Sequence, residues 1–331
     1  KELVGWSISV PPDAAAAAAS LLADVVERPT FPSHAVATER AHLLTELRAR
    51  RDDMVRHPMA LARGALLAGH AYALDASGTP ETVATLDDGA LRGWHARLVL
   101  TGAPVLAVVG DAPPETLAAL VAAPFTALRP GARSVVAPVH VTEGVRQVVD
   151  TRDRRQSALA MLFAGPSRTD DDRFALGMLT GIASGLGGRF FESLRSRQSL
   201  AYSVSTSATT WRAGGVIASY IACAPEREDE AREGLLREFA ALRDDGVTSE
   251  ELERARRHAL GMDALRQESG AARLADMVDA WLLGTGIGEL RAEREGIARV
   301  TVDDVQRVAR RWCTGEPRAE GIVRGVPGAS A

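Results

Sequence analysis

The 331-residue sequence predicts an α+β fold of two similar domains, each with an antiparallel or mixed sheet and helices on one face of it. Three observations support this prediction. The tetrapeptide Thr85-Leu-Asp-Asp88 recurs 216 residues later as Thr301-Val-Asp-Asp304. Ser33 and Ser249, which are each placed to start a long helix, have the same separation. Strand and helix patterns also follow one another in the same order in both halves, as in an internal repeat.

The first half begins with a segment, 4–10, in which apolar and small or polar residues alternate as in a strand. An alanine-rich stretch, 13–26, follows and predicts a helix, and Ser33 starts a longer one. The motif at 85–88 opens a third helix. After the Thr-Gly pair that follows this helix, the apolar run 105–109 predicts a second strand.

The second half repeats this order and adds elements before it. The segment 215–222 is the counterpart of 4–10, and the segment 322–323 is the counterpart of 105–109. Alternating or continuous apolar patterns predict further strands, and helical patterns predict further helices. The added strands are 157–163 and 201–206, and the helices of this half are 172–182, 189–197, 228–242, one from Ser249 and one from Thr301.

The repeat divides the chain into a first domain, 1–136, and a second domain, 145–331. About 80 residues lie between this boundary and Pro225 in the second half, whereas eleven residues precede Pro12 in the first. If the repeat is complete in the parent protein, roughly 70 residues precede Lys1 there. We therefore expect the first domain to be incomplete at its N-terminus.

Composition excludes several classes of function. The 43 acidic residues outnumber the 39 basic ones, which argues against a nucleic acid as the main partner. Lys1 is the only lysine, so the chain has no P-loop lysine and no buried Schiff-base lysine. No apolar run approaches the ~18 residues of a membrane span, so we expect no membrane partner. Cys223 and Cys313 are too few for a disulfide framework, which favours a cytoplasmic location.

One cluster of residues on the first long helix could bind a metal ion. His42 and Glu46 are four residues apart and therefore share a helix face, and Glu39 lies near the same face. The alternative is a solvent-exposed polar face. The repeat pairs Glu46 with Met262 and His42 with His258, so a carboxylate occurs in one copy and a thioether in the other. This difference indicates different roles for the two copies, and the repeated histidine argues against His42 as a ligand.

Several segments together resemble the pitrilysin/insulinase family of metallopeptidases, closest to its two-domain members such as mitochondrial processing peptidase and bacterial zinc proteases. The most specific segment is 187–204, GGRFFESLRSRQSLAYSV, and the resemblance covers nearly the whole chain. Further segments follow in the family's order: 29–31, 39–47, 69–72, 78–80, 108–111, 174–179 and 246–255.

The resemblance implies a zinc site formed by a His-x-x-Glu-His helix and a glutamate on a later helix. Glu46 matches that later glutamate, and Glu39 matches a supporting acidic position. None of the seven histidines forms His-x-x-Glu-His, so we expect no catalytic residue in this chain itself. In the family, that motif precedes the segment at which this chain begins.

The resemblance also matches Arg195 and Tyr202 to a pair that grips the substrate. A guanidinium presents two donors to peptide carbonyl groups, and a phenol adds one donor near the developing oxyanion. The alternative is that Arg195 caps its helix and Tyr202 packs within a strand.

The predicted function is therefore a zinc-dependent endopeptidase, with zinc bound in the complete assembly. It would cleave peptides or unfolded segments in a chamber formed by paired chains, as a homodimer or as a heterodimer with a related peptidase subunit. One alternative is a non-catalytic subunit that supplies Arg195 and Tyr202 to a partner bearing His-x-x-Glu-His. Another is a scaffold or binding protein with the same fold and no proteolytic activity.

Overall fold

The computed structural model of the chain describes residues 2–129, 131–132, 135–185 and 187–326. The chain forms two compact units, and each contains segments from both halves of the sequence. Unit 1 comprises Lys1–Arg48, Ala76–Val135 and Ala264–Leu290. Unit 2 comprises Ala49–Asp75, Val136–Asp263 and Arg291–Ala331. The repeat boundaries at 136 and 145 stay a prediction.

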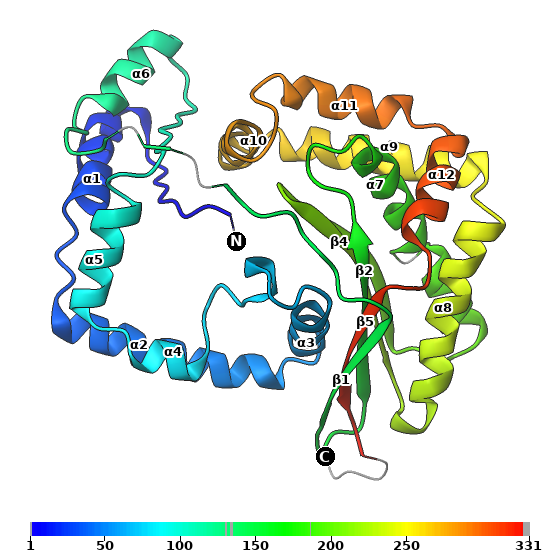
Figure 1. Cartoon of the computed structure of the whole chain (residues 1–331). Helices are drawn as coiled ribbons and strands as arrows, with labels where there is room; N and C mark the ends of the chain where they lie inside the picture. Colours follow the sequence, from blue (N-terminus) through cyan, green and yellow to red (C-terminus); the bar gives the residue numbers. More distant parts are fainter. Residues whose placement is uncertain (1, 130, 133–134, 186, 327–331) are drawn as a thin grey trace. The chain divides into compact units, whose positions relative to one another are not determined.

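Unit 2 is built on one five-stranded mixed sheet, in the order β1-β5-β2-β4-β3 (Figure 1). β1 pairs with β5 in parallel, and every other neighbouring pair is antiparallel. The strands are β1 (Val145–Thr151), β2 (Ser157–Gly165), β3 (Ser203–Trp211), β4 (Gly214–Cys223) and β5 (Arg318–Arg324).

Helices cover both faces of this sheet because β2 is apolar along both of its sides. On one face, alternate residues such as Leu159 and Phe163 join the main core. This core also contains residues of α7 (Asp172–Ala183), α8 (Glu228–Asp244), α9 (Ser249–Arg266) and α12 (Val302–Trp312). On the other face, Ala160 and Leu162 pack against α3 (Arg56–Leu66). The α+β class is confirmed, but α3 adds a helix to the face that the sequence predicted to be uncovered.

The backbone of α3 lies directly against β5 at Gly321. A β-carbon on Gly321 would lie 2.0 Å from the Pro58 carbonyl oxygen and 2.6 Å from the Ala62 nitrogen. Only a residue without a side chain fits such an approach. Since α3 comes from the first half of the sequence and β5 from the second, this contact joins distant segments within unit 2.

Unit 1 is helical in the part of the chain that the structure describes. Its helices are α1 (Ala15–Glu27), most of α2 (Ser33–Asp52), α4 (Pro80–Ala84), α5 (Asp88–Leu98), α6 (Pro114–Ala122) and α10 (Gly270–Leu282). The segments 4–10 and 105–109, expected as strands, form neither strand nor helix. An alternating pattern makes a strand only where a neighbouring strand accepts its backbone hydrogen bonds, and neither segment has one among the described residues.

The remaining helices and strands lie close to their predicted bounds, but one helix cap, one strand and one helix type differ from the prediction. Thr301 caps α12 and forms a capping box with Asp304, as its motif suggests. In the first copy Asp87 caps α5 in place of Thr85. β1 was not predicted, because it is a largely exposed edge strand without clear alternation. The segment 191–197 is a π-helix, and α11 (Glu289–Arg299) is a further helix; short 3₁₀ helices lie at Pro12–Ala14, Ala71–Ala73 and Pro225–Arg227.

Asp150, at the end of β1, joins this strand to the start of α3. It accepts a hydrogen bond of 2.9 Å from Arg152 Nη2, and its Oδ2 lies 2.8 Å from His57 Nε2. The Arg152 guanidinium and the His57 imidazole lower the pKa of the Asp150 carboxyl to about 2.

None of the helices that the structure describes combines the length and the apolar character needed to cross a bilayer.

We predict that Gly321→Ala lowers the free energy of unfolding by roughly 1–3 kcal/mol, because a methyl group overlaps the α3 backbone and forces the helix away from the sheet. Urea unfolding followed by circular dichroism measures the change. Gly177→Ala is the matched control, since a β-carbon on Gly177 meets no atom within 4 Å and alanine favours α7. Equal stability of the two variants would contradict close packing at Gly321.

We also predict that the contribution of Asp150 depends on acid pH. Its folded pKa lies below the ordinary 3.8, so its ionised form stabilises the fold above that pH, and this stabilisation disappears as the pH falls towards 2. Asp150→Asn should therefore cost about 1–2 kcal/mol at pH 6 and progressively less between pH 4 and pH 2. Urea unfolding across this range tests the prediction, with the exposed Asp229→Asn as control. A cost that does not change with pH would contradict it.

Candidate functional site

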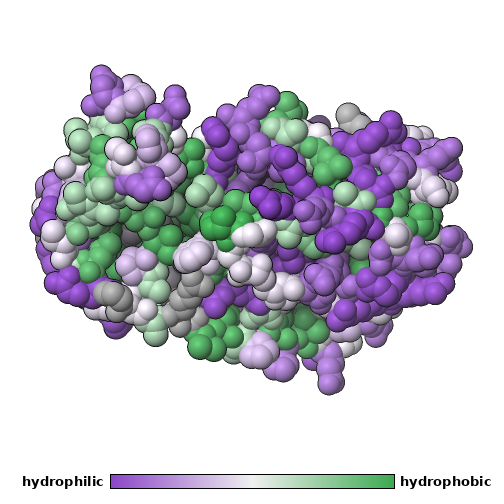
Figure 2. Space-filling model, turned by 90° about the horizontal axis from the view of Figure 1, so that it is seen from above, coloured by the Kyte–Doolittle hydropathy of each residue, from purple (hydrophilic) through white to green (hydrophobic). Residues whose placement is uncertain are grey.

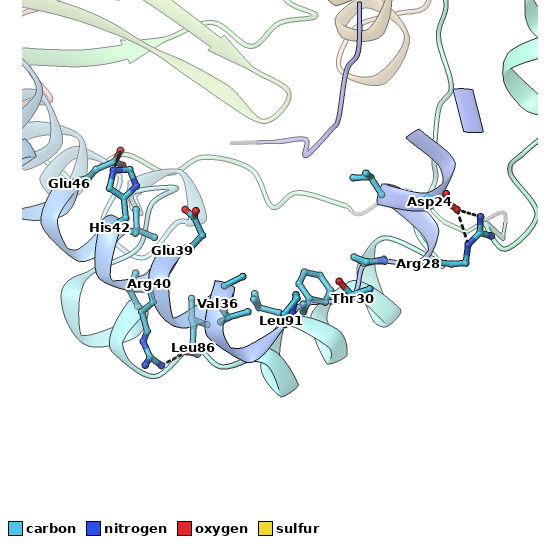
Figure 3. Close-up of a pocket in the computed structure, with 17 residues that line it drawn as sticks. Asp24, Arg28, Thr30, Val36, Glu39, Arg40, His42, Glu46, Leu86 and Leu91 are labelled. Atoms are coloured by element: carbon cyan, nitrogen blue, oxygen red, sulfur yellow. Dashed lines mark hydrogen bonds and ion pairs between the residues drawn. The ribbon is translucent and has the colours of Figure 1, made fainter. Parts of the chain in front are cut away.

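The acidic and histidine residues expected near a metal lie together on α2, in a pocket of unit 1 of about 980 Å³. Figure 3 shows Glu39, His42 and Glu46 on one side of the helix. His42 Nε2 lies 3.9 Å from Glu46 Oε1, and 49% of the Glu46 side chain is exposed. The spacing along α2 therefore places these three residues as the sequence predicts, with Glu46 accessible from the pocket.

Apolar side chains make up most of the remaining pocket wall. They are Val25, Pro29, Phe31, Pro32, Ala35, Val36, Leu43, Val83, Leu86 and Leu91. Arg40 donates a hydrogen bond of 2.8 Å to the Leu86 carbonyl oxygen, and Arg92 donates one of 2.6 Å to the Thr30 carbonyl oxygen. These bonds hold the loops at either end of the pocket against α2 and α5. Figure 2 also shows apolar residues at the surface around α1 and α6, on the left.

The repeat relates this apolar wall to the core of unit 2. At a separation of 216 residues, Phe31, Val36, Leu43 and Leu86 correspond to Val247, Leu252, Ala259 and Val302. All four counterparts belong to or pack against the main core of unit 2, together with Leu176 and Leu179 of α7. The apolar wall of the pocket in unit 1 thus corresponds to residues that are in the core of unit 2, to which α7 also contributes.

The two glutamates of the pocket have uncharged counterparts in unit 2, whereas Arg40 and His42 recur as Arg256 and His258. Glu39 corresponds to Ala255, and a β-carbon on Gly181 of α7 would lie 3.8 Å from the Ala255 β-carbon. Glu46 corresponds to Met262. Where unit 2 presents an alanine and a thioether, unit 1 presents carboxylates, which are ligands for a cation or acceptors for a polar helix.

The described residues do not by themselves form a zinc site. No group of three or more His, Cys, Asp or Glu residues in the described ranges is arranged to hold a metal ion. A catalytic zinc site usually has three protein ligands; the pocket offers the His42–Glu46 pair and nearby Glu39, while its other carboxylate, Asp24, is paired with Arg28. The donor set is therefore insufficient for zinc without residues from elsewhere.

Arg195 and Tyr202 lie in unit 2, and both side chains are exposed. Arg195 is in the last turn of the π-helix, a type of helix often found at functional sites, and its guanidinium stacks on the Phe191 ring at 4.9 Å. Tyr202 immediately precedes β3, and its side chain is 54% exposed. Tyr202 is therefore not a core residue, although its backbone joins the sheet. The Tyr202 nitrogen donates to the Ala222 carbonyl oxygen at 2.8 Å.

The π-helix that carries Arg195 is anchored to α8. Ser193 Oγ donates a hydrogen bond of 2.5 Å to Glu238 Oε1, and Gln198 Nε2 donates one of 3.1 Å to Ser193 Oγ. Leu194 is fully buried in the main core. The residues on either side of Arg195 are therefore fixed while Arg195 itself stays accessible. No sequence pattern predicts the contact between Ser193 and Glu238 of α8, which joins residues more than 40 positions apart.

Residues 85–258 match the family model described as the peptidase M16 inactive domain, and this match covers more than half of the chain. The chain belongs to the peptidase M16 family. The resemblance to pitrilysin/insulinase-type peptidases is thereby confirmed, and the matched domain is the one that the family describes as inactive.

Bacterial relatives cover most of this peptidase M16 chain. It is 28% identical over 298 residues to an uncharacterised zinc protease of Mycobacterium tuberculosis. The aligned residues cover 68% of that protein and 88% of this chain. It is 25% identical over 304 residues to an uncharacterised zinc protease of Streptomyces coelicolor, covering 88% and 66% respectively.

Solved structures share the fold. The peptidase M16 inactive domain from Pseudomonas fluorescens superposes with a TM-score of 0.84 at 20% identity, over 95% of this chain and 76% of that one. A protease from Helicobacter pylori superposes with a TM-score of 0.78 at 15% identity, over 95% and 77%. At these identities the likeness concerns the fold alone.

We predict that the untagged, purified chain binds much less than one zinc ion per molecule, because it offers too few ligands. Inductively coupled plasma mass spectrometry after dialysis against zinc measures the content, and Glu46→Gln should leave it nearly unchanged. A monomer of this chain with stoichiometric zinc and chelator-sensitive peptidase activity would refute the prediction.

Proposed function

We propose that this chain is part of a zinc-dependent endopeptidase that cleaves peptides or unfolded segments. In this proposal Glu46 supplies one metal ligand with support from Glu39, and Arg195 and Tyr202 grip the substrate. The observation that carries it is the α2 pocket, whose apolar wall corresponds to core residues of unit 2 and which carries Glu39 in place of the core residue Ala255 and Glu46 in place of the exposed Met262. The names of the bacterial relatives as zinc proteases agree with it.

The missing ligands would come from a helix with the His-x-x-Glu-His pattern that fits this pocket. Zinc bound there would supply a Lewis acid for water and for the scissile carbonyl group. The residues of this chain would hold the carboxylate side of that site and bind the peptide. A homodimer, or a heterodimer with a related peptidase subunit, would enclose the substrate. We also propose that the protein is located in the cytoplasm.

Arg195 and Tyr202 have the chemistry to bind what all peptides share. The guanidinium carries several N–H donors in one plane and can bind backbone carbonyl oxygens of any sequence. The Tyr202 hydroxyl adds a single donor. Because Arg195 makes no hydrogen bond to helix carbonyl groups among the described residues, its donors are available for a ligand.

A second candidate is a non-catalytic subunit that supplies only Arg195 and Tyr202 to a metal-bearing partner. The match to the inactive domain of the family favours this alternative. The two proposals differ in the role of Glu46. Glu46→Gln should abolish zinc-dependent cleavage by the assembly in the first and leave it unchanged in the second.

We predict that Arg195→Ala and Tyr202→Phe each lower kcat/KM for an unstructured fluorogenic peptide by about tenfold or more in the complete assembly, because each removes a donor to the substrate. Thermal melting should change little, since both side chains are exposed. Arg197→Ala is the matched control, because Arg197 lies on the same π-helix and pairs with Glu192. Unchanged kcat/KM in both variants would contradict a role of Arg195 and Tyr202 in substrate binding.

A further inference from the structure

We infer that Arg227 is a positioning residue for the Arg195–Tyr202 pair. It lies just before α8, where it holds the short loop 198–200 that connects the two substrate-gripping residues. This inference rests on the proposed peptide-binding role of the pair. It adds a residue that makes no substrate contact itself and acts by fixing the backbone of the loop.

The loop adopts a backbone conformation that needs support. Ser199 has φ of +47°, in the left-handed region that residues with a side chain seldom adopt. Such a conformation is strained and persists only where the surroundings determine it. The Ser199 nitrogen donates to the Arg195 carbonyl oxygen at 3.1 Å, and the Leu200 nitrogen donates to the Leu194 carbonyl oxygen at 2.8 Å.

Arg227 binds the carbonyl side of this loop. Its Nη1 donates a hydrogen bond of 2.8 Å to the Ser199 carbonyl oxygen, and its Nη2 lies 3.5 Å from the Gln198 carbonyl oxygen. Glu230 holds the guanidinium in place with two hydrogen bonds of 2.9 Å, from Nε and Nη2. A planar group with several fixed donors can bridge a loop and a carboxylate in this way, whereas the donors of a lysine all project from one nitrogen and are less well placed for it.

The apolar side of the loop is fixed by a glycine on α8. Leu194 and Leu200 are buried, and a β-carbon on Gly234 would lie 2.8 Å from Leu194 Cδ2 and 3.3 Å from Leu200 Cδ2. The two leucines therefore fill a notch that Gly234 leaves open. With its apolar side in this notch and its carbonyl side on Arg227, the loop places Arg195 and Tyr202 at its two exposed ends.

The first test measures peptide affinity. The probe is a fluorescein-labelled, unstructured decapeptide with blocked termini, titrated with the chain and followed by fluorescence anisotropy. Arg227→Ala should weaken binding about five- to tenfold and Arg227→Lys less, with little further loss when Arg227→Ala is added to Arg195→Ala/Tyr202→Phe. Arg232→Ala is the matched control, because Arg232 forms a similar ion pair with Asp229 on α8.

The second test measures the loop itself by hydrogen–deuterium exchange. Arg227→Ala should speed amide exchange in 193–202, and the Arg232 control should not. Unchanged exchange in this segment, or an equal loss of affinity in the wild-type and the Arg195→Ala/Tyr202→Phe backgrounds, would overturn the inference. Two results would contradict the proposed peptide-binding role of Arg195 and Tyr202: an unchanged affinity in Arg195→Ala/Tyr202→Phe, or no binding of the probe by the wild-type chain. Either result would also overturn the inference about Arg227, because it rests on that role.

Discussion

The close approach of α3 to β5 is the contact on which the rest of unit 2 depends. A central strand that is apolar on both faces needs cover on both, and the main helical layer covers only one. The second face is covered because Gly321 lets the α3 backbone lie directly on the sheet. This contact brings a first-half segment into unit 2, and the sheet is thereby buried on two sides.

Unit 1 contains repeats of segments found in unit 2, but it has no β-sheet among the described residues. Its two alternating or apolar segments form no strand among the described residues, and the helices present apolar side chains to a pocket. The corresponding side chains of unit 2 are in a closed core with α7. This difference matters for Glu39, because its carboxylate is accessible in the pocket whereas its counterpart Ala255 is in the closed core of unit 2.

The two groups of candidate functional residues are positioned by different means. Glu39, His42 and Glu46 need only the periodicity of one helix, so their relation is local. Arg195 and Tyr202 depend on a π-helix, a left-handed serine and contacts with α8 that join distant parts of the chain. The second arrangement therefore involves contacts with Arg227 and Gly234, which are distant in the sequence, whereas the first involves one helix.

The sequence by itself determined the α+β class, the order of most elements and the shared face of Glu39 and Glu46, because periodicity and capping act over a few residues. It also identified the family through the segment around Arg195 and Tyr202. Tertiary structure decided the rest: the absence of strands at 4–10 and 105–109, the edge strand β1, the second cover by α3 and the support of Ser199 by Arg227. Each of these depends on which distant backbone or side chain lies opposite, and no local pattern encodes that.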